Sequence, residues 1–174
     1  MACVPVFLFV FIIECSAKFM SIITSTKNIV ARIVTVIFRR KIRFPAVAII
    51  IENPHGEILM LLRDDKPSIS FPNHWSLVGG KVERGETFEV AAYRELLEEI
   101  GVDLDLTLWK RYDRQHPNAI VDQHIYLGKT DLPLKSLTLG EGQDMRFFNS
   151  NDVKGLNIAF EFDSLLEEYF LNHP

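Results

Sequence analysis

The pattern of hydrophobic and polar positions is clearest between residues 87 and 100. This stretch holds neither Gly nor Pro, and most of its residues favour a helix. Thr87 is a typical N-cap residue, and Gly101 is typical of the position that follows a helix. At about 100° per residue, one broad apolar arc collects Val90, Ala92, Tyr93, Leu96, Leu97 and Ile100. The pattern therefore predicts an amphipathic helix that buries this arc and exposes an acidic side.

The flanking segments are typical of strands, loops and a second helix. Short runs rich in β-branched and aromatic residues, bounded by polar or Gly/Pro clusters, predict strands. These runs lie at residues 46–52, 57–63, 75–78, 104–112, 119–128 and 145–148. The remaining expectations are loops at 64–74 and 133–142, a capped turn at 149–152 and a closing helix at 161–171. Strands that alternate with helices favour an α/β domain, although they do not fix the order of the strands.

The acidic side of the first helix needs an explanation, because its carboxylates crowd together. Glu95, Glu98 and Glu99 are three or four residues apart, and each like-charged pair costs a helix roughly 0.2–0.5 kcal/mol. Arg94 relieves Glu98 but leaves Glu95 facing Glu99, and the small Ala91 one turn earlier does not cover them. Uncovered carboxylates suit a hard divalent cation such as Mg²⁺. A solvated acidic face explains the same residues, and the helix alone does not decide between the two interpretations.

Composition narrows the classes of function. Of the 174 residues, 48% are hydrophobic and 24% are charged, which is ordinary for a globular protein. The net charge of −4 gives no basic excess of the kind that coats nucleic acid, so no nucleic-acid polymer is expected as a partner. Cys3 and Cys15 both precede the expected domain, which excludes from it a disulfide framework, a cysteine metal site and a cysteine nucleophile. A reducing, cytoplasmic location is therefore expected.

Residues 1–43 differ from the domain expected at 44–174. Residues 4–13 form an unbroken apolar run, too short for a membrane-spanning helix, which takes about 20 residues. The run has the length of a signal-peptide core, but no Lys or Arg precedes it. The basic cluster at 39–43 favours, alternatively, a membrane-surface segment next to anionic lipid. We favour a third interpretation, an extension outside the domain, whose apolar run is absent if translation starts at Met20.

The spacing of residues around the acidic helix forms a signature. Five residues separate Gly80 from Glu86, and seven separate Glu86 from Arg94-Glu95-Leu96. One residue then precedes Glu98-Glu99, and one more precedes Gly101-Val102. This spacing resembles the signature of the Nudix hydrolase family, GX5EX7REUXEEXGU with U aliphatic, and every position is met. Seven fixed letters and two aliphatic ones arise by chance less than about once in a billion start positions. The flanking HWSLVGGKVERGE is most similar to the MutT-like branch, apart from Val78, where that branch usually has Pro.

The resemblance covers residues 80–102 and implies a fold, a metal and a set of ligands. The Nudix fold is an α/β fold in which a mixed β-sheet is sandwiched between α-helices, with the motif as a loop-helix-loop on one side. Mg²⁺, or Mn²⁺ in its place, is expected to bind Glu95, Glu98, Glu99 and the main-chain carbonyl of Gly79. One of these glutamates, or a further acid from a loop, is expected to act as the base.

The family pattern also implies roles for other residues of the motif. Arg94 is expected to orient Glu86 or a neighbouring glutamate, although simple pairing on the helix surface explains it equally. Gly80 and Gly85 are expected where the backbone bends tightly, and Gly101 where the helix ends.

Outside the motif, four residues are candidates. Glu141 in EGQDMRFF is similar in place to a loop acid that assists catalysis in MutT-like enzymes; its plainer role is an exposed loop residue. Arg63 ends a strand and suits a substrate phosphate. Trp75 and Tyr126 suit stacking on a base, although aromatic residues in strands belong more often to the core.

The substrate is less closely defined than the chemistry. Likeness to the MutT-like branch favours a nucleoside triphosphate, ordinary or oxidised, cleaved to a monophosphate and pyrophosphate. Residues 159–160 are Ala-Phe roughly where that branch carries an Asn that reads the damaged base, and Pro117 has a spacing found in ADP-ribose pyrophosphatases. The alternatives are an ADP-ribose or nucleotide-sugar pyrophosphatase and, in another class, a regulatory module that binds a nucleotide without cleaving it. The complete set of acids favours the enzyme.

Overall fold

The computed structural model describes residues 41–116 and 119–173. The predictions for residues 1–40 and for Pro117 lie outside these described residues. The chain divides after Ile42 into two units, and the sheet and helices described below belong to the second, Arg43–Pro174. In the described part of the chain, no helix combines the length and the apolar composition needed to cross a membrane.

Among the residues that the structure describes, six strands form one mixed sheet. They are β1 (Ile42–Glu52), β2 (Ile58–Leu62), β3 (Trp75–Ser76), β4 (Thr107–His116), β5 (Ala119–Lys129) and β6 (Asp144–Phe148). The order is β3-β2-β1-β5-β4, and β6 pairs with β2. β1 is antiparallel to β2, and β4 is antiparallel to β5. The ends of β1 and β5 lie together, because Thr130 N–H donates to the Glu52 carbonyl at 3.0 Å, so these two strands run parallel.

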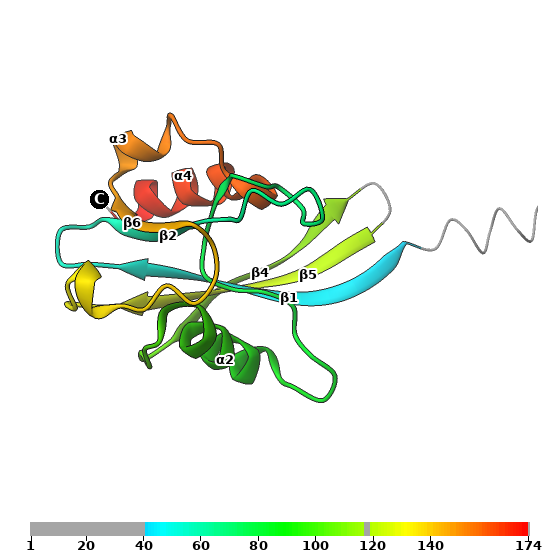
Figure 1. Ribbon diagram of the computed structural model, residues 1–174. Coiled ribbons are helices and arrows are strands. Elements are labelled where there is room, and N and C mark those ends of the chain that lie inside the picture. Colours follow the sequence, from blue (N-terminus) through cyan, green and yellow to red (C-terminus); the bar gives the residue numbers. More distant parts are fainter. Residues whose placement is uncertain (1–40, 117–118, 174) are drawn as a thin grey trace, which may run out of the picture. The chain divides into compact units, whose positions relative to one another are not determined.

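Helices cover both faces of the sheet (Figure 1). α2 (Phe88–Ile100) lies on one face, and α3 (Ser150–Val153) and α4 (Phe162–Asn172) lie on the other. β1 supplies both cores, because its alternate side chains point to opposite faces. Val47 and Ile49 pack with α2, whereas Ala48 and Ile50 pack with α4. This confirms the predicted α/β Nudix fold, a mixed sheet between helices.

The ends of the helices follow from local chemistry. The Thr87 hydroxyl accepts from Val90 N–H at 3.2 Å, and Gly101 ends α2 with a φ of 70°, which few residues other than Gly adopt. Asn149 caps α3 and forms a capping box with Asp152. The predicted helix ends and the capped turn are thus confirmed.

The predicted bounds of two strands were wrong, and one predicted loop contains a turn. β1 begins at Ile42, four residues before its predicted start. β4 begins at Thr107 and not at residue 104, and it extends to His116, because its pairing with β5 continues as far as His116 opposite Ala119. The predicted loop 133–142 contains a 3-10 turn at Leu134–Ser136. The other strands begin and end within about four residues of their predicted positions, as expected for boundaries read from sequence.

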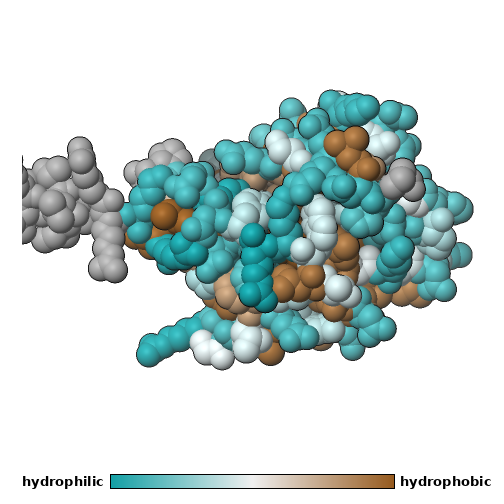
Figure 2. All heavy atoms as spheres, turned by 180° about the vertical axis from the view of Figure 1, so that it is seen from behind, coloured by the Kyte–Doolittle hydropathy of each residue, from teal (hydrophilic) through white to brown (hydrophobic). Residues whose placement is uncertain are grey.

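The predicted apolar arc of α2 was also partly wrong. Val90 is 53% exposed and Leu97 is 57% exposed, whereas Ala91 and Glu95 are buried with the rest of the inner face. The helix therefore turns its small Ala91 and one acid toward the sheet, and it leaves two aliphatic side chains in solvent. On the face shown in Figure 2, hydrophilic residues predominate and hydrophobic residues lie in small groups between them.

Candidate active site

A cavity of about 670 Å³ joins the motif to the opposite side of the sheet. Its acidic end is formed by residues of α2 and of two loops: Gly79, Gly80, Glu95, Glu98, Glu99 and Glu141. The cavity is also lined by Arg114, Gln123, Phe160 and Phe162, and Arg63 lies close to both groups, since its charge acts on Glu99 and its guanidinium carbon lies 5.0 Å from the Phe160 ring centroid. The fold thus brings together the predicted metal ligands, the loop acid and the predicted phosphate-binding arginine.

Arg94 connects the motif residues to one another. Its guanidinium donates to the Glu86 carboxylate from Nε at 2.8 Å and from Nη2 at 3.1 Å. Nη1 donates to Glu95 at 2.8 Å and to Glu98 at 2.9 Å, and Nη2 also donates to the Lys81 carbonyl at 3.0 Å. The bond to Glu86 is the main cause that raises the pKa of Arg94, and it lowers the pKa of Glu86. Arg94 thereby fixes the loop that precedes α2 to the acidic side of the helix.

Gly80 makes room for Glu95. A Cβ atom on Gly80 would lie 2.4 Å from Oε1 of Glu95, and the Glu95 residue is only 9% exposed. Burial, opposed by the bond from Arg94, raises the pKa of the Glu95 carboxyl above its ordinary value. Gly80 was predicted at a tight bend, but the reason that this position requires Gly is the close approach of Glu95. Gly85 does lie in a turn, with a φ of 95°. Because Glu95 is buried, a plain solvated acidic face does not describe this side of α2.

Glu99 is fixed by the backbone of the preceding loop. Its Oε2 accepts from Gly79 N–H at 2.8 Å. The carbonyls on either side of Gly79, those of Val78 and Gly80, accept bonds from Ile49 and Val47. Burial is the first cause that raises the pKa of Glu99, to about 8, and the charges of Glu95 and Glu141 add to it. The site thus holds a partly buried carboxyl that needs a positive charge nearby to ionise readily at neutral pH.

A loop brings Glu141 to this cluster. Gly140 N–H donates to the Glu99 carbonyl at 2.8 Å, and Thr138 N–H donates to the Ile100 carbonyl at 3.0 Å. These bonds extend the loop along the end of α2. Glu141 lines the cavity, and its charge acts on both Glu95 and Glu99. The structure therefore places the predicted loop acid beside the acids of the motif.

The stability of the metal-free protein should fall as pH rises. The pKa of Glu99 is about 8 in the folded protein against 4.5 for an ordinary Glu, so the folded state keeps a proton that the unfolded chain has lost. The free energy of unfolding should therefore decrease from about pH 5 to pH 8 and level off above that. Glu99→Gln removes this titration. Its melting temperature, measured in EDTA across this range, should fall less than that of the wild type.

Glu98→Gln is the matched control, since the Glu98 side chain is 58% exposed and lies next to Glu99 in the sequence. This variant should keep the pH dependence of the wild type. Equal slopes for all three proteins would contradict a proton on Glu99.

The structure separates the predicted substrate-binding residues. Arg63 lines the cavity, where its Nε donates to the Ser70 carbonyl at 3.1 Å. Trp75 does not line it and packs edge-on against Phe148, with centroids 4.7 Å apart. Tyr126 does not line it either and is 6% exposed in the core under α2. The structure therefore favours the plainer interpretation, a core position, for both aromatic residues.

Arg114 and Gln123 were not predicted as site residues from the sequence. Phe160 was noted only because residues 159–160 lie roughly where the MutT-like branch carries an Asn. All three line the cavity. The sequence offers only a weak indication of the role of Arg114 and Gln123, because each lies in a strand whose other residues are typical of strands. Only the pairing of β4 with β5 brings them to one face.

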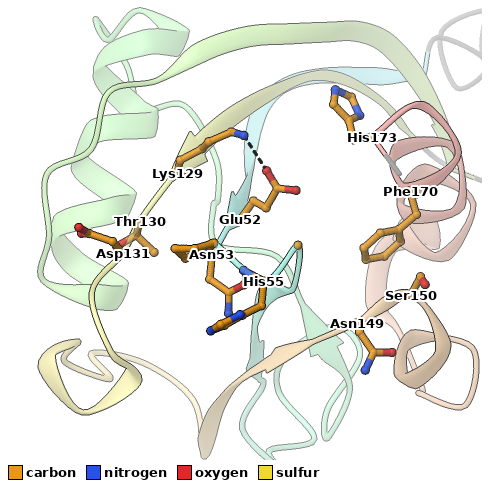
Figure 3. Close-up of a pocket in the computed structure, with 12 residues that line it drawn as sticks. Glu52, Asn53, His55, Lys129, Thr130, Asp131, Asn149, Ser150, Phe170 and His173 are labelled. Carbon is orange, nitrogen blue, oxygen red and sulfur yellow. Dashed lines mark hydrogen bonds and ion pairs between the residues drawn. The ribbon is translucent and has the colours of Figure 1, made fainter.

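A second cavity, of about 900 Å³, lies at the other end of β1 (Figure 3). Lys129 and Glu52 are paired across it at 3.0 Å, and Phe170 and His173 border it from the end of α4. None of the motif acids lines it. Although it is larger, it lacks the chemistry of the first cavity, which is the candidate active site.

The donor set of the first cavity fits a hard cation. Glu95, Glu98 and Glu99 offer carboxylate oxygens, which Mg²⁺ prefers. Burial first, and then the charges of neighbouring carboxylates, raise the pKa values of Glu95 and Glu99, and a bound positive charge would oppose both effects. As arranged here, no group of three or more His, Cys, Asp or Glu side chains in the described residues already stands ready to hold a metal ion. Glu98 lines the cavity while more than half of its side chain is exposed, so its carboxylate is accessible to a cation that enters from solvent.

Comparisons with known proteins agree with this site. The model of the family described as NUDIX domain matches residues 42–168. An uncharacterized Nudix hydrolase of Listeria innocua is 33% identical over 129 residues, which are 72% of this chain and 73% of that protein. An 8-oxo-dGTP diphosphatase of Haemophilus influenzae is 41% identical over 83 residues, which are 45% of this chain and 57% of that protein.

The fold is also found among solved structures. The crystal structure of the MutT protein from Methanosarcina mazei Go1 has a TM-score of 0.66 and 21% identity, and the match covers 77% of this chain and 97% of that one. The resemblance seen in the motif is thereby confirmed over most of the domain. Because the matched span contains both the motif helix and the acid-lined cavity, the chain belongs to the Nudix family of hydrolases.

Proposed function

We propose that this Nudix hydrolase cleaves nucleoside triphosphates to a nucleoside monophosphate and pyrophosphate, and that it depends on Mg²⁺. The proposal rests on one observation: the motif acids line the same cavity as Arg63, Arg114 and the buried Gln123. A nucleotide is anionic at one end and aromatic at the other, so it needs both kinds of surface in one site. Similarity to a relative named 8-oxo-dGTP diphosphatase supports the triphosphate over ADP-ribose or a nucleotide sugar.

Glu95, Glu98, Glu99 and the Gly79 carbonyl are the proposed ligands. Bound there, Mg²⁺ or Mn²⁺ supplies positive charge that neutralises phosphate oxygens and makes a water more acidic. Arg94 keeps Glu95 and Glu98 on the cavity side of α2 through bonds of 2.8 and 2.9 Å. The Gly79 N–H keeps Glu99 directed at the same loop.

The reaction adds water across a phosphoanhydride. A water oxygen bonds to one phosphorus, the bond from that phosphorus to the bridging oxygen breaks, and the water's protons pass to a base and to solvent. The base is one of the motif glutamates or Glu141, which stand together at the acidic end. Arg63, whose charge already acts on Glu99, is placed to hold a phosphate of the substrate.

A substrate panel with Mg²⁺ tests the proposal. It contains ordinary and oxidised nucleoside triphosphates, ADP-ribose, dinucleoside polyphosphates and sugar nucleotides, with products separated by chromatography. We expect triphosphates to give monophosphate and pyrophosphate, and EDTA to abolish turnover until Mg²⁺ or Mn²⁺ is restored. Faster cleavage of ADP-ribose or a sugar nucleotide would contradict the assigned substrate. Tight binding by calorimetry, with no product from any compound, would instead favour a regulatory module.

A further inference from the structure

Two buried donors at the far end of the acid-lined cavity have no hydrogen-bond partner. They are Nε of Arg114 and Nε2 of Gln123, a residue that is only 2% exposed. Both residues line the same cavity as the motif acids. A buried donor without an acceptor is costly, and folded proteins keep few of them. A ligand that brings acceptor atoms to this end would satisfy both donors.

The pairing of β4 with β5 sets these donors side by side. Arg114 lies opposite Val121, and Tyr112 lies opposite Gln123, so the four side chains share one face of the sheet. Tyr112 packs in the core under α4, so this face is the one away from α2. As diagonal neighbours, Arg114 and Gln123 have Cβ atoms roughly 7–8 Å apart, close enough for one planar group to contact both.

Phe160 positions the guanidinium of Arg114. The guanidinium carbon of Arg114 lies 5.4 Å from the centroid of the Phe160 ring, and that of Arg63 lies 5.0 Å from it. Phe160 has a φ of 62° and Glu161 a φ of 60°, a backbone region that few residues other than Gly adopt. Strained residues of this kind occur where the surrounding structure holds them, and here they present the ring to the cavity.

The polarity of the two ends decides which part of a nucleotide each one suits. The acidic end, with Arg63 nearby, suits phosphates, since their charge needs a metal or an arginine. Gln123 is neutral and buried, and it lies on the face of the sheet away from α2. Arg114 is charged, but a guanidinium donates to the carbonyl oxygen of a base as well as to a phosphate, and the neutral Gln123 amide beside it favours the base.

Resting on the proposed function, we propose that Arg114 and Gln123 recognise the nucleobase and select bases whose edge carries carbonyl oxygens. Guanine, hypoxanthine and uracil have such an edge, whereas adenine and cytosine carry an amino group at the corresponding position. A carbonyl edge accepts from both Gln123 and Arg114, whereas an amino group there leaves Nε of Arg114 unpaired, because a guanidinium only donates. Discrimination of this kind is strong because the unpaired groups are buried.

Binding of α,β-methylene nucleoside triphosphates, measured by calorimetry with Mg²⁺, tests the inference apart from catalysis. The wild type should bind the guanine and uracil analogues about tenfold more tightly than the adenine and cytosine analogues. Gln123→Leu should weaken the first pair about tenfold and the second pair clearly less, because only the first pair accepts from Gln123 and Arg114 together. Gln123→Glu replaces the donor by an acceptor, so it should favour adenine over guanine.

Gln115→Leu is the matched control, because Gln115 is an exposed residue of β4 that does not line the cavity. It should keep the preference of the wild type. If Gln123→Glu does not fold, as judged by circular dichroism, the Leu variant decides, since it buries no charge.

Equal binding of all four analogues by the wild type, or a Gln123→Leu variant that weakens all four alike, overturns base selection even if triphosphates are hydrolysed. Failure to hydrolyse any triphosphate contradicts the proposed function instead, whatever the binding preference. The two failures are therefore distinguishable.

Discussion

Glu99→Gln should lower the turnover number by ~10³-fold while the protein stays folded. Gln keeps the size of the side chain, and its carbonyl oxygen can still accept from Gly79 N–H, which now lies 2.8 Å from Oε2. The substitution removes one negative charge from the proposed metal site, where charge on the ligands holds Mg²⁺. Steady-state rates at saturating Mg²⁺ and saturating nucleotide measure the loss in kcat directly.

Glu98→Gln should reduce turnover in the same way but with less effect on stability, because its side chain is 58% exposed. Removing one of several repelling carboxylates should stabilise the metal-free protein by only ~0.5 kcal/mol. A solvated acidic face predicts the same small change in the stability of the metal-free protein and an unchanged rate, whereas a role in metal binding predicts a large loss of rate. Turnover close to that of the wild type in both variants would show that the metal ligands are wrongly assigned.

The helix of the motif could be predicted from sequence because its signals are local. Thr87 and Gly101 act on their nearest neighbours in the chain, and the fixed spacing of the motif is contained in 23 consecutive residues, 80–102. The helix face was harder to predict. Val90 and Leu97 belong to the apolar arc by period, yet they are exposed, whereas the acidic Glu95 is buried next to Gly80.

The other end of the site depends on contacts between distant segments. Its residues lie in three separate elements: Arg114 in β4, Gln123 in β5 and Phe160 in a 3-10 turn at Ala159–Glu161. No local pattern in the sequence relates them. The unpaired donors of Arg114 and Gln123 are visible only when burial and partners are known. A signature that specifies the chemistry of a family therefore leaves the base specificity to residues outside it.

Gly80→Ala should reduce kcat by about 10²-fold with little loss of stability. The added Cβ would lie 2.4 Å from Oε1 of Glu95 and 2.8 Å from its carboxyl carbon, so one of the two must move. The carboxylate is the end of a flexible side chain, and it can shift more cheaply than the backbone of the loop. If Glu95 is a metal ligand as proposed, a shift of about 1 Å in its carboxylate is enough to cost two orders of magnitude in rate.

Two other glycines make this prediction decisive. Gly155→Ala meets no heavy atom within 4 Å and should behave as the wild type. Gly79→Ala would place its Cβ 2.4 Å from the Val47 carbonyl oxygen at a φ of 140°, so it should unfold at a clearly lower temperature as well as lose activity. Melting temperatures and rates for the three variants then separate displacement of Glu95 from a damaged fold. If Gly80→Ala keeps full activity, the position of Glu95 next to Gly80 is not needed for catalysis.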